Sequence, residues 1–144
     1  MIACVLYFGS IACVPGFFLG CDESVKVAQE EFGPRALLKK YEWLKETHAQ
    51  LDKKRNDIKV YEGRMKTMDE TYKSIPRIQW PREDREQHNT WSSEVAGTKA
   101  SYNDLAAQYN AKMKEEHWRF ANKGELPQGA SEVLPRDYVR YEDK

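Results

Sequence analysis

The clearest pattern in this chain is a seven-residue repeat of apolar side chains in its first half. Between residues 35 and 73, large apolar residues recur every seven positions, with others three or four positions away. This spacing places them on one stripe of an α-helix, as in a coiled coil, while Lys, Arg, Asp and Glu occupy the other faces. The pattern therefore predicts a helix whose seam is formed by Leu37, Leu44, Leu51, Ile58, Met65 and Tyr72, flanked by Tyr41, His48, Tyr61 and Met68.

A second helical pattern follows a connection that contains two prolines. Pro76 and Pro81 cannot lie inside a helix without removing a backbone hydrogen bond, so residues 74–80 are predicted to form the connection, with Pro81 at the first helical position. Residues 81–121 again carry apolar side chains at helical spacing, and Gly124 suits the left-handed residue that ends a helix. The predicted seam of this second helix consists of Trp91, Val95, Thr98, Tyr102, Leu105, Tyr109, Met113 and Phe120.

Two helices of similar length joined by a short connection are expected to fold back on each other as an antiparallel hairpin. Each arm would be about 55 to 60 Å long at 1.5 Å per residue. Residues 122–144 have two prolines and scattered apolar residues, which predict an irregular tail that Leu126, Val133, Leu134 and Tyr138 could dock onto the hairpin. The predicted fold class is all-α: a long, coiled-coil-like antiparallel two-helix hairpin with a short N-terminal helical segment and an irregular C-terminal tail.

The hairpin follows an apolar opening segment that stops abruptly at a cysteine. Residues 1–20 contain no Asp, Glu, Lys or Arg, and Cys21 is followed at once by Asp22 and Glu23. About 20 apolar residues suffice for a transmembrane helix, but glycine and proline residues in this segment are poor helix formers. Small residues before a cleavage site are what a signal peptidase requires. The segment therefore fits either a cleaved signal peptide or an uncleaved anchor.

The sequence FLGC at residues 18–21 resembles the lipobox of bacterial lipoprotein precursors. The resemblance implies that residues 1–20 are a signal peptide of the lipoprotein type. It also implies that Cys21 becomes the first residue of the mature chain, with a diacylglycerol on its thiol and an acyl chain such as palmitate on its amino group. Leu19 stands where that family has a small residue, and no Lys or Arg precedes Lys26. Two alternatives therefore stay open, an uncleaved single-span subunit of a membrane complex and ordinary secretory cleavage.

Two acidic residues after the cysteine suggest a location. Asp22 followed by Glu23 is similar to the signal that retains enterobacterial lipoproteins in the inner membrane, which implies the periplasmic face of that membrane. Two or more acyl chains would hold the protein there nearly permanently. Residues 21–34 would then be the acylated cysteine and an acidic spacer that ends at Gly33 and Pro34. The alternative is that the two acids simply begin a solvated linker.

Composition narrows the classes of protein that the chain can belong to. Lys and Arg number 23, as do Asp and Glu, so the charge balance gives no sign of a nucleic-acid surface. The cysteines are Cys4, Cys13 and Cys21, so a chain that begins at Cys21 cannot form an internal disulfide. His88 and His117 would lie roughly 43 Å apart along the second helix, too far to share a metal ion within one chain.

The sequence also lacks the signatures of catalysis. It contains no recognisable nucleophile elbow, metal-ligand spacing or glycine-rich phosphate loop, so we expect neither an enzyme nor a small-molecule substrate. We expect no metal and no cofactor other than the lipid on Cys21. Trp80 and Trp91 fall near the predicted tip of the hairpin, where exposed aromatic side chains would suit docking to another protein. Alternatively, these side chains cap the turn.

These observations together predict a bacterial envelope lipoprotein with a non-catalytic binding, tethering or assembly role. Its partners would be the lipid bilayer, through Cys21, and either another envelope protein or a second copy of the chain. Small helical lipoproteins of this type are also carried by prophages, where some resemble proteins that exclude a second phage. No specific family resemblance covers residues 22–144.

Overall fold

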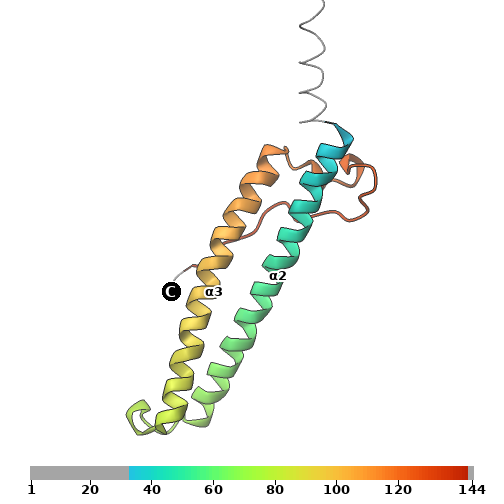
Figure 1. Ribbon diagram of the computed structural model, residues 1–144. Helices are drawn as coiled ribbons and strands as arrows, with labels where there is room; N and C mark the ends of the chain where they lie inside the picture. The colour runs from blue at the N-terminus through green and yellow to red at the C-terminus, as the bar shows by residue number, and fades with distance from the viewer. Residues whose placement is uncertain (1–32, 143–144) are drawn as a thin grey trace, which may run out of the picture.

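The computed structural model describes residues 33–142, which form two long helices and a tail folded back along them (Figure 1). Helix α2 comprises Pro34–Thr71 and helix α3 comprises Arg82–Glu115. A 3₁₀ helix, η1, lies in the turn between them, and η2 and η3 follow α3. These three short elements span Arg77–Gln79, Arg119–Ala121 and Lys123–Glu125. The predicted pair of long helices that pack against each other is confirmed, while the short N-terminal helical segment lies outside the described residues.

The seven-residue repeat forms the contact between the two helices. Its central members Leu44, Leu51 and Ile58 are fully buried, and those near the two ends of α2 are half-buried. Burying one such side chain stabilises the fold by about 1.5 to 3 kcal/mol. The main core cluster consists of Tyr41, Leu44, Leu51, Tyr102, Ala106, Tyr109, Met113, Phe120, Leu134 and Tyr138.

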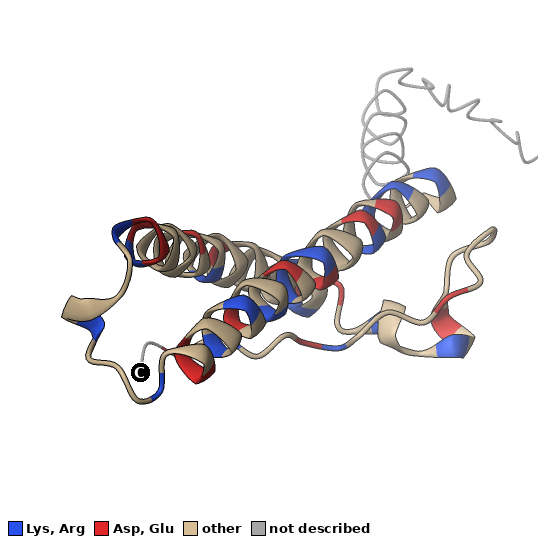
Figure 2. Cartoon of the chain, turned by 90° about the horizontal axis from the view of Figure 1, so that it is seen from below, with Lys and Arg blue, Asp and Glu red and all other residues tan. Residues whose placement is uncertain are grey.

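Polar contacts across the two helices fix their register from the open end of the hairpin to its tip. Lys40 pairs with Glu116 at 2.7 Å near the open end, and Lys99 pairs with Glu62 at 2.7 Å further along. Between them, Lys54 Nζ donates to the Ser101 hydroxyl at 2.9 Å. Positions of Lys and Arg alternate with those of Asp and Glu along both helices (Figure 2).

The turn lies close to where the prolines predicted it. Helix α2 ends at Thr71, two residues before the predicted end, and α3 begins at Arg82. Pro81 occupies the N-cap of α3 and not its first helical position, because its ψ of 141° is outside the helical range. The missing N–H of proline is harmless at this boundary, since the first N–H groups of a helix have no partner inside the helix.

The predicted end of the second helix at residue 121 is wrong. Helix α3 ends at Glu115 with Glu116 as its C-cap, and the two residues after the cap close it: the Trp118 N–H donates to the Met113 carbonyl at 2.9 Å, and the His117 N–H donates to the Lys114 carbonyl at 2.9 Å. This is the Schellman arrangement, which usually contains glycine. Here His117 and Trp118 adopt φ of 51° and 56°, a left-handed conformation that costs about 1 to 2 kcal/mol per residue.

Burial explains why the chain accepts that cost. Glu116 lies beside Lys40, so α3 ends before it reaches the level of Pro34, where α2 begins. Turning at this point buries Phe120 against Tyr41, with ring centroids 5.8 Å apart. The Phe120 carbonyl then accepts a hydrogen bond from the backbone N–H of the tail, which returns along the hairpin.

The tail runs from the open end of the hairpin to about its middle (Figure 1). Apart from η3 it is irregular, as predicted, over the residues that the structure describes. Leu134 and Tyr138 are buried and Leu126 packs against the same core, whereas Val133, also predicted to dock, is exposed.

Candidate functional site

Trp80 closes the tip of the hairpin and is not available as an exposed docking residue. Its ring stacks on Tyr72 at a centroid distance of 4.7 Å and meets His88 edge-on at 5.8 Å. The indole N–H donates to the Ile75 carbonyl at 3.1 Å. Only 8 % of the side chain is exposed, so the expectation of an exposed Trp80 is wrong and the residue caps the turn instead. The exposed large apolar residues at the tip are Ile75 and Ile78.

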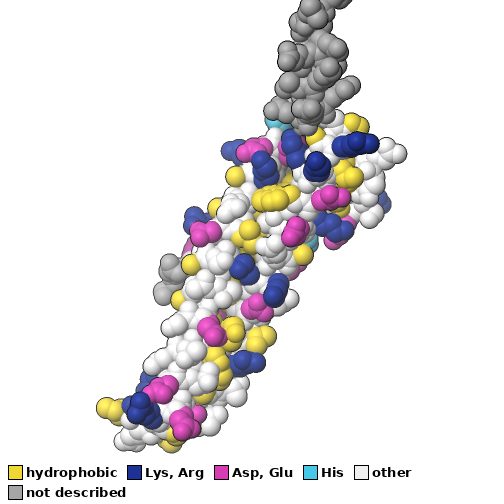
Figure 3. Space-filling view, in the orientation of Figure 1, with side chains coloured by type: hydrophobic (Ala, Val, Ile, Leu, Met, Phe, Trp, Pro, Cys, Tyr) yellow, Lys and Arg dark blue, Asp and Glu magenta, His cyan; other side chains and the backbone are white. Residues whose placement is uncertain are grey.

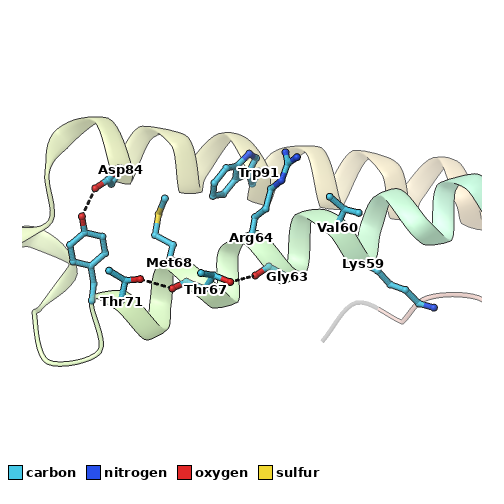
Figure 4. Close-up of a pocket in the computed structure, with 10 residues that line it drawn as sticks. Lys59, Val60, Gly63, Arg64, Thr67, Met68, Thr71, Asp84 and Trp91 are labelled. Carbon is cyan, nitrogen blue, oxygen red and sulfur yellow. Dashed lines mark hydrogen bonds between the residues drawn. The ribbon is translucent and has the colours of Figure 1, made fainter.

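Trp91, the second tryptophan proposed for docking, lines an open groove in the half of the hairpin nearer the tip. We call this cavity of about 680 Å³ the distal groove (Figure 4). Helix α2 supplies most of its wall, and α3 contributes Trp91 and Asp84. The lining residues are Lys59, Val60, Gly63, Arg64, Thr67, Met68, Thr71, Tyr72, Asp84 and Trp91.

The floor of the distal groove is more apolar than its composition suggests. The Thr67 hydroxyl donates to the Gly63 carbonyl at 3.0 Å, and the Thr71 hydroxyl donates to the Thr67 carbonyl at 2.9 Å (Figure 4). Because these bonds use the hydroxyl protons within α2, the threonines act largely through their methyl groups. Val60 is 52 % exposed, and the space beside Gly63 is open.

Charged and aromatic groups frame this apolar floor. The Arg64 guanidinium lies 5.9 Å from the centre of the Trp91 ring and 5.7 Å from that of Tyr61. At the tip end of the groove, the Tyr72 hydroxyl donates to the Asp84 carboxylate, which raises the pKa of Tyr72. A half-buried tryptophan with an arginine across its face is a frequent arrangement at protein interfaces, which are enriched in both residues. On the face shown in Figure 3, small groups of apolar side chains alternate with charged ones along the length of the molecule.

In the other half of the hairpin, the tail covers a surface formed by both helices. We call this surface the tail groove. The Asn110 side-chain amide makes two hydrogen bonds of 2.8 Å with the backbone of Tyr138, one to its carbonyl and one from its N–H. The Asn103 amide binds the backbone of Tyr141 in the same way, at 2.9 and 2.7 Å.

Tyrosine hydroxyls of the two helices bind the tail backbone beside these asparagines. Tyr41, Tyr102 and Tyr109 donate to tail carbonyls at 2.8, 3.3 and 2.5 Å. The acceptors are the carbonyls of Glu132, Val139 and Pro135 respectively. The hydroxyls thereby satisfy buried polar groups of the tail, which an apolar groove would leave without partners.

Tyr138 is the most enclosed tail residue with an ionisable group. Its hydroxyl is hydrogen-bonded to Nδ1 of His48, and the Arg55 guanidinium lies 5.6 Å from the centre of its ring. Burial raises the pKa of Tyr138 to about 12, and the nearby Asp52 carboxylate adds to the rise. Burial also raises the pKa of Tyr109. These phenols remain protonated at neutral pH, and the Tyr109 hydroxyl donates to the Pro135 carbonyl.

The sequence predicted that Leu134 and Tyr138 dock the tail onto the hairpin, but the hydrogen bonds from the helices to the tail backbone were not predicted, although the sequence carries a signal for them. Asn103 and Asn110 are seven residues apart on one side of the predicted seam, and such repeated amides on a helix face could have indicated a bound backbone. His48, by contrast, was expected on the seam as a hydrogen-bonded structural residue, and that is where the structure places it.

The remaining predictions fall partly outside the part of the chain that the structure describes. Cys21, Asp22 and Glu23, proposed for lipidation and sorting, precede residue 33. Within residues 33–142, no cluster of three His, Cys, Asp or Glu side chains could hold a metal ion. Over the same range, no helix combines the length and the apolar character that a membrane crossing requires.

Comparisons with known proteins do not identify a family for this chain. No protein-family model, curated protein or solved structure matches the chain.

Proposed function

We propose that this chain is a bacterial envelope lipoprotein, anchored through lipid on Cys21, whose hairpin binds another envelope protein without catalysing a reaction. Asp22 and Glu23 would retain it on the periplasmic face of the inner membrane. The proposal includes the prophage-encoded form of this role, in which the bound protein serves phage entry. The observation that carries the binding role is the distal groove, with its apolar floor and half-buried Trp91.

The direction of the hairpin supports a tethering role. Helix α2 begins at Pro34, thirteen positions after Cys21, and its 38 residues extend for about 57 Å to the tip. An anchor at Cys21 would therefore hold the open end of the hairpin near the bilayer. The distal groove, in the half of the hairpin nearer the tip, would then be presented at a distance from the membrane.

The chemistry of the distal groove supports a protein partner. Its floor would bury Val60 and Trp91 beneath an apolar side chain of the partner, while Arg64 at its edge could pair with a carboxylate. Such an aromatic anchor with a charged rim is typical of the few residues that carry most of the binding free energy in an interface.

Lipid attachment is tested by labelling cells that express the chain with radioactive palmitate. We expect label in the wild-type product and none in the Cys21→Ser variant, since the serine hydroxyl does not replace the thiol as the acceptor. An unlabelled wild-type product would contradict the anchor and favour the uncleaved single-span alternative.

Binding through the groove is tested by photo-crosslinking the full chain in its own membranes, with a crosslinking amino acid at Thr67. We expect one defined envelope protein to be crosslinked, and Val60→Asp to reduce the yield at least about tenfold by placing a charge on the apolar floor. Val139→Asp is the matched control, because that valine is 80 % exposed and lies outside the groove. Equal yields from wild type and Val60→Asp would contradict the proposed docking site.

A further inference from the structure

The tail is held in the manner of a bound peptide. Over residues 132–142, seven hydrogen bonds join hairpin side chains to tail backbone atoms, namely four from Asn103 and Asn110 and three from tyrosines. In the same range, the backbone–backbone bond to the hairpin is the one from Leu134 N to Phe120 O, at 3.0 Å. Backbone contacts of this kind bind any extended chain, while pockets for individual side chains select the sequence.

The spacing of the two asparagines matches an extended chain. Asn103 and Asn110 are seven residues apart on α3, which corresponds to about 10.5 Å along the helix. The tail residues that they bind, Tyr138 and Tyr141, are three apart, and three extended residues cover about 10 Å. The two amides therefore meet successive backbone sites of one strand-like segment.

Side-chain pockets add selectivity for the tail sequence. Leu134 and Tyr138 are buried, and the Tyr141 ring meets Tyr102 edge-on at a centroid distance of 4.9 Å. The Tyr138 ring meets Tyr109 edge-on at 5.0 Å. The groove thus accommodates a leucine followed four and seven positions later by tyrosines, as in LPRDYVRY at residues 134–141.

The connection to the tail is much longer than its docked position requires. Phe120 O and Leu134 N are only 3.0 Å apart, a gap that a short turn could close. The thirteen residues between them, 121–133, could extend over about 43 to 47 Å. Most of their side chains are exposed, and swinging this loop outward would withdraw Leu126 and Ala130 from the edge of the core while the contact between α2 and α3 stays in place.

From these contacts and this reach, we propose that the tail is an exchangeable arm. Residues 132–142 of one copy occupy the tail groove of a second copy, whose own tail occupies the first, and two hairpins are joined by reciprocal exchange. Each contact that holds the tail within one chain is reproduced in the exchanged pair, which is the condition for domain swapping. The inference depends on the described fold and needs no lipid on Cys21.

Two complementary variants test the exchange. A groove variant, Asn103→Ala with Asn110→Ala, keeps its tail sequence; a tail variant, Tyr138→Ala with Tyr141→Ala, keeps its groove. Full chains are purified in detergent with reductant, and their masses are measured by native mass spectrometry over a range of concentrations. We expect wild type to become dimeric as its concentration rises. In the mixture we expect a 1:1 heterodimer in excess over both homodimers, because only the mixed pair forms an intact groove–tail contact that neither variant has within its own chain.

A loop-shortened variant provides a control that leaves both the groove and the tail residues unchanged. Deleting residues 123–129 leaves six connecting residues, which extend only about 20 Å but still close the 3.0 Å gap within one chain. We expect this variant to remain monomeric at concentrations where wild type pairs, and this holds as a test even if the substituted variants lose their helical circular dichroism. A wild type that stays monomeric, or dimers that persist in the loop-shortened variant, would overturn the proposal.

Discussion

The two halves of the hairpin are built from the same pair of helices but are stabilised differently. In the half near the open end, which we call the covered half, the tail adds a third layer over the contact between α2 and α3 (Figure 1). In the half near the tip, which we call the bare half, the residues that the structure describes are those of the two helices and the turn. The difference shows how a two-helix hairpin, which buries one stripe per helix, gains enough core to be stable.

The buried residues follow this division. The covered half contains the large core cluster with its tyrosines, whereas the bare half buries mainly Ile58, Val95 and Trp80. The covered half also contains the hydrogen bonds that join side chains of the two helices to backbone atoms of the tail. The bare half keeps an open groove beside Trp91 and Val60. Because the tail covers only the other half, this groove is the surface that we propose for binding.

The largest loss of stability is expected when the central side chain of the tail is removed. Tyr138→Ala should lower the free energy of unfolding by about 3 kcal/mol, because it leaves a cavity among buried tyrosines and frees the tail. Val139→Ala, at an exposed neighbouring position, should change it by less than about 0.5 kcal/mol. Urea denaturation followed by circular dichroism measures both, and equal effects would mean that the tail is not part of the core.

Removing a single amide should weaken the covered half by a smaller amount. Asn110→Ala deletes two hydrogen bonds and leaves the N–H and carbonyl of Tyr138 without those partners, at a cost of about 2 kcal/mol. Gln108→Ala, at an exposed position of the same helix, is the matched control and should be nearly neutral. Hydrogen exchange at the Tyr138 amide should accelerate in the asparagine variant, and unchanged exchange there would contradict the role given to Asn110.

High pH should also affect the covered half. The pKa of Tyr138 is raised from 10.0 to about 12, so the folded chain holds this proton more tightly than the unfolded chain does. The resulting stabilisation is fully present below pH 10 and is lost as the pH rises toward 12, by up to about 1.4 kcal/mol for each pH unit. Urea unfolding at pH 9, 10 and 11 measures this loss. Tyr138→Phe should reduce the slope, and an unchanged slope would assign it to other groups.

The smallest effect is expected in the bare half and has the opposite sign. Gly63 lies inside α2, and a Cβ built at this position meets nothing within 4 Å. Gly63→Ala should therefore raise the free energy of unfolding by about 0.5 to 1 kcal/mol through the helix propensity of alanine. Thermal unfolding gives the size of the change, and a loss of stability would show that the groove floor is more closely packed than the structure indicates.

Local patterns in the sequence were sufficient to predict the framework of the fold. The repeat that includes Leu44, Leu51 and Ile58 specifies one buried stripe, and Pro76 and Pro81 restrict where the chain can turn. Both signals act over a few residues, so they need no knowledge of distant contacts.

Features that depend on distant contacts were not predicted. The end of α3 depends on burying Phe120 against Tyr41, which favours two left-handed residues, His117 and Trp118, without the usual glycine. Trp80 is buried because Tyr72 and His88, on opposite sides of the turn, come together around it. The asparagine contacts likewise join residues 28 and 38 positions apart in sequence, beyond the range of any local pattern.

The central claim, that lipid on Cys21 anchors a binding hairpin, is tested most directly by the intact mass of the chain extracted from its own membranes. We expect a product that begins at Cys21 and carries the added mass of a diacylglycerol and one further acyl chain, with fragmentation placing that mass on the first residue. A product that retains Met1 and has an unmodified Cys21 would contradict the claim.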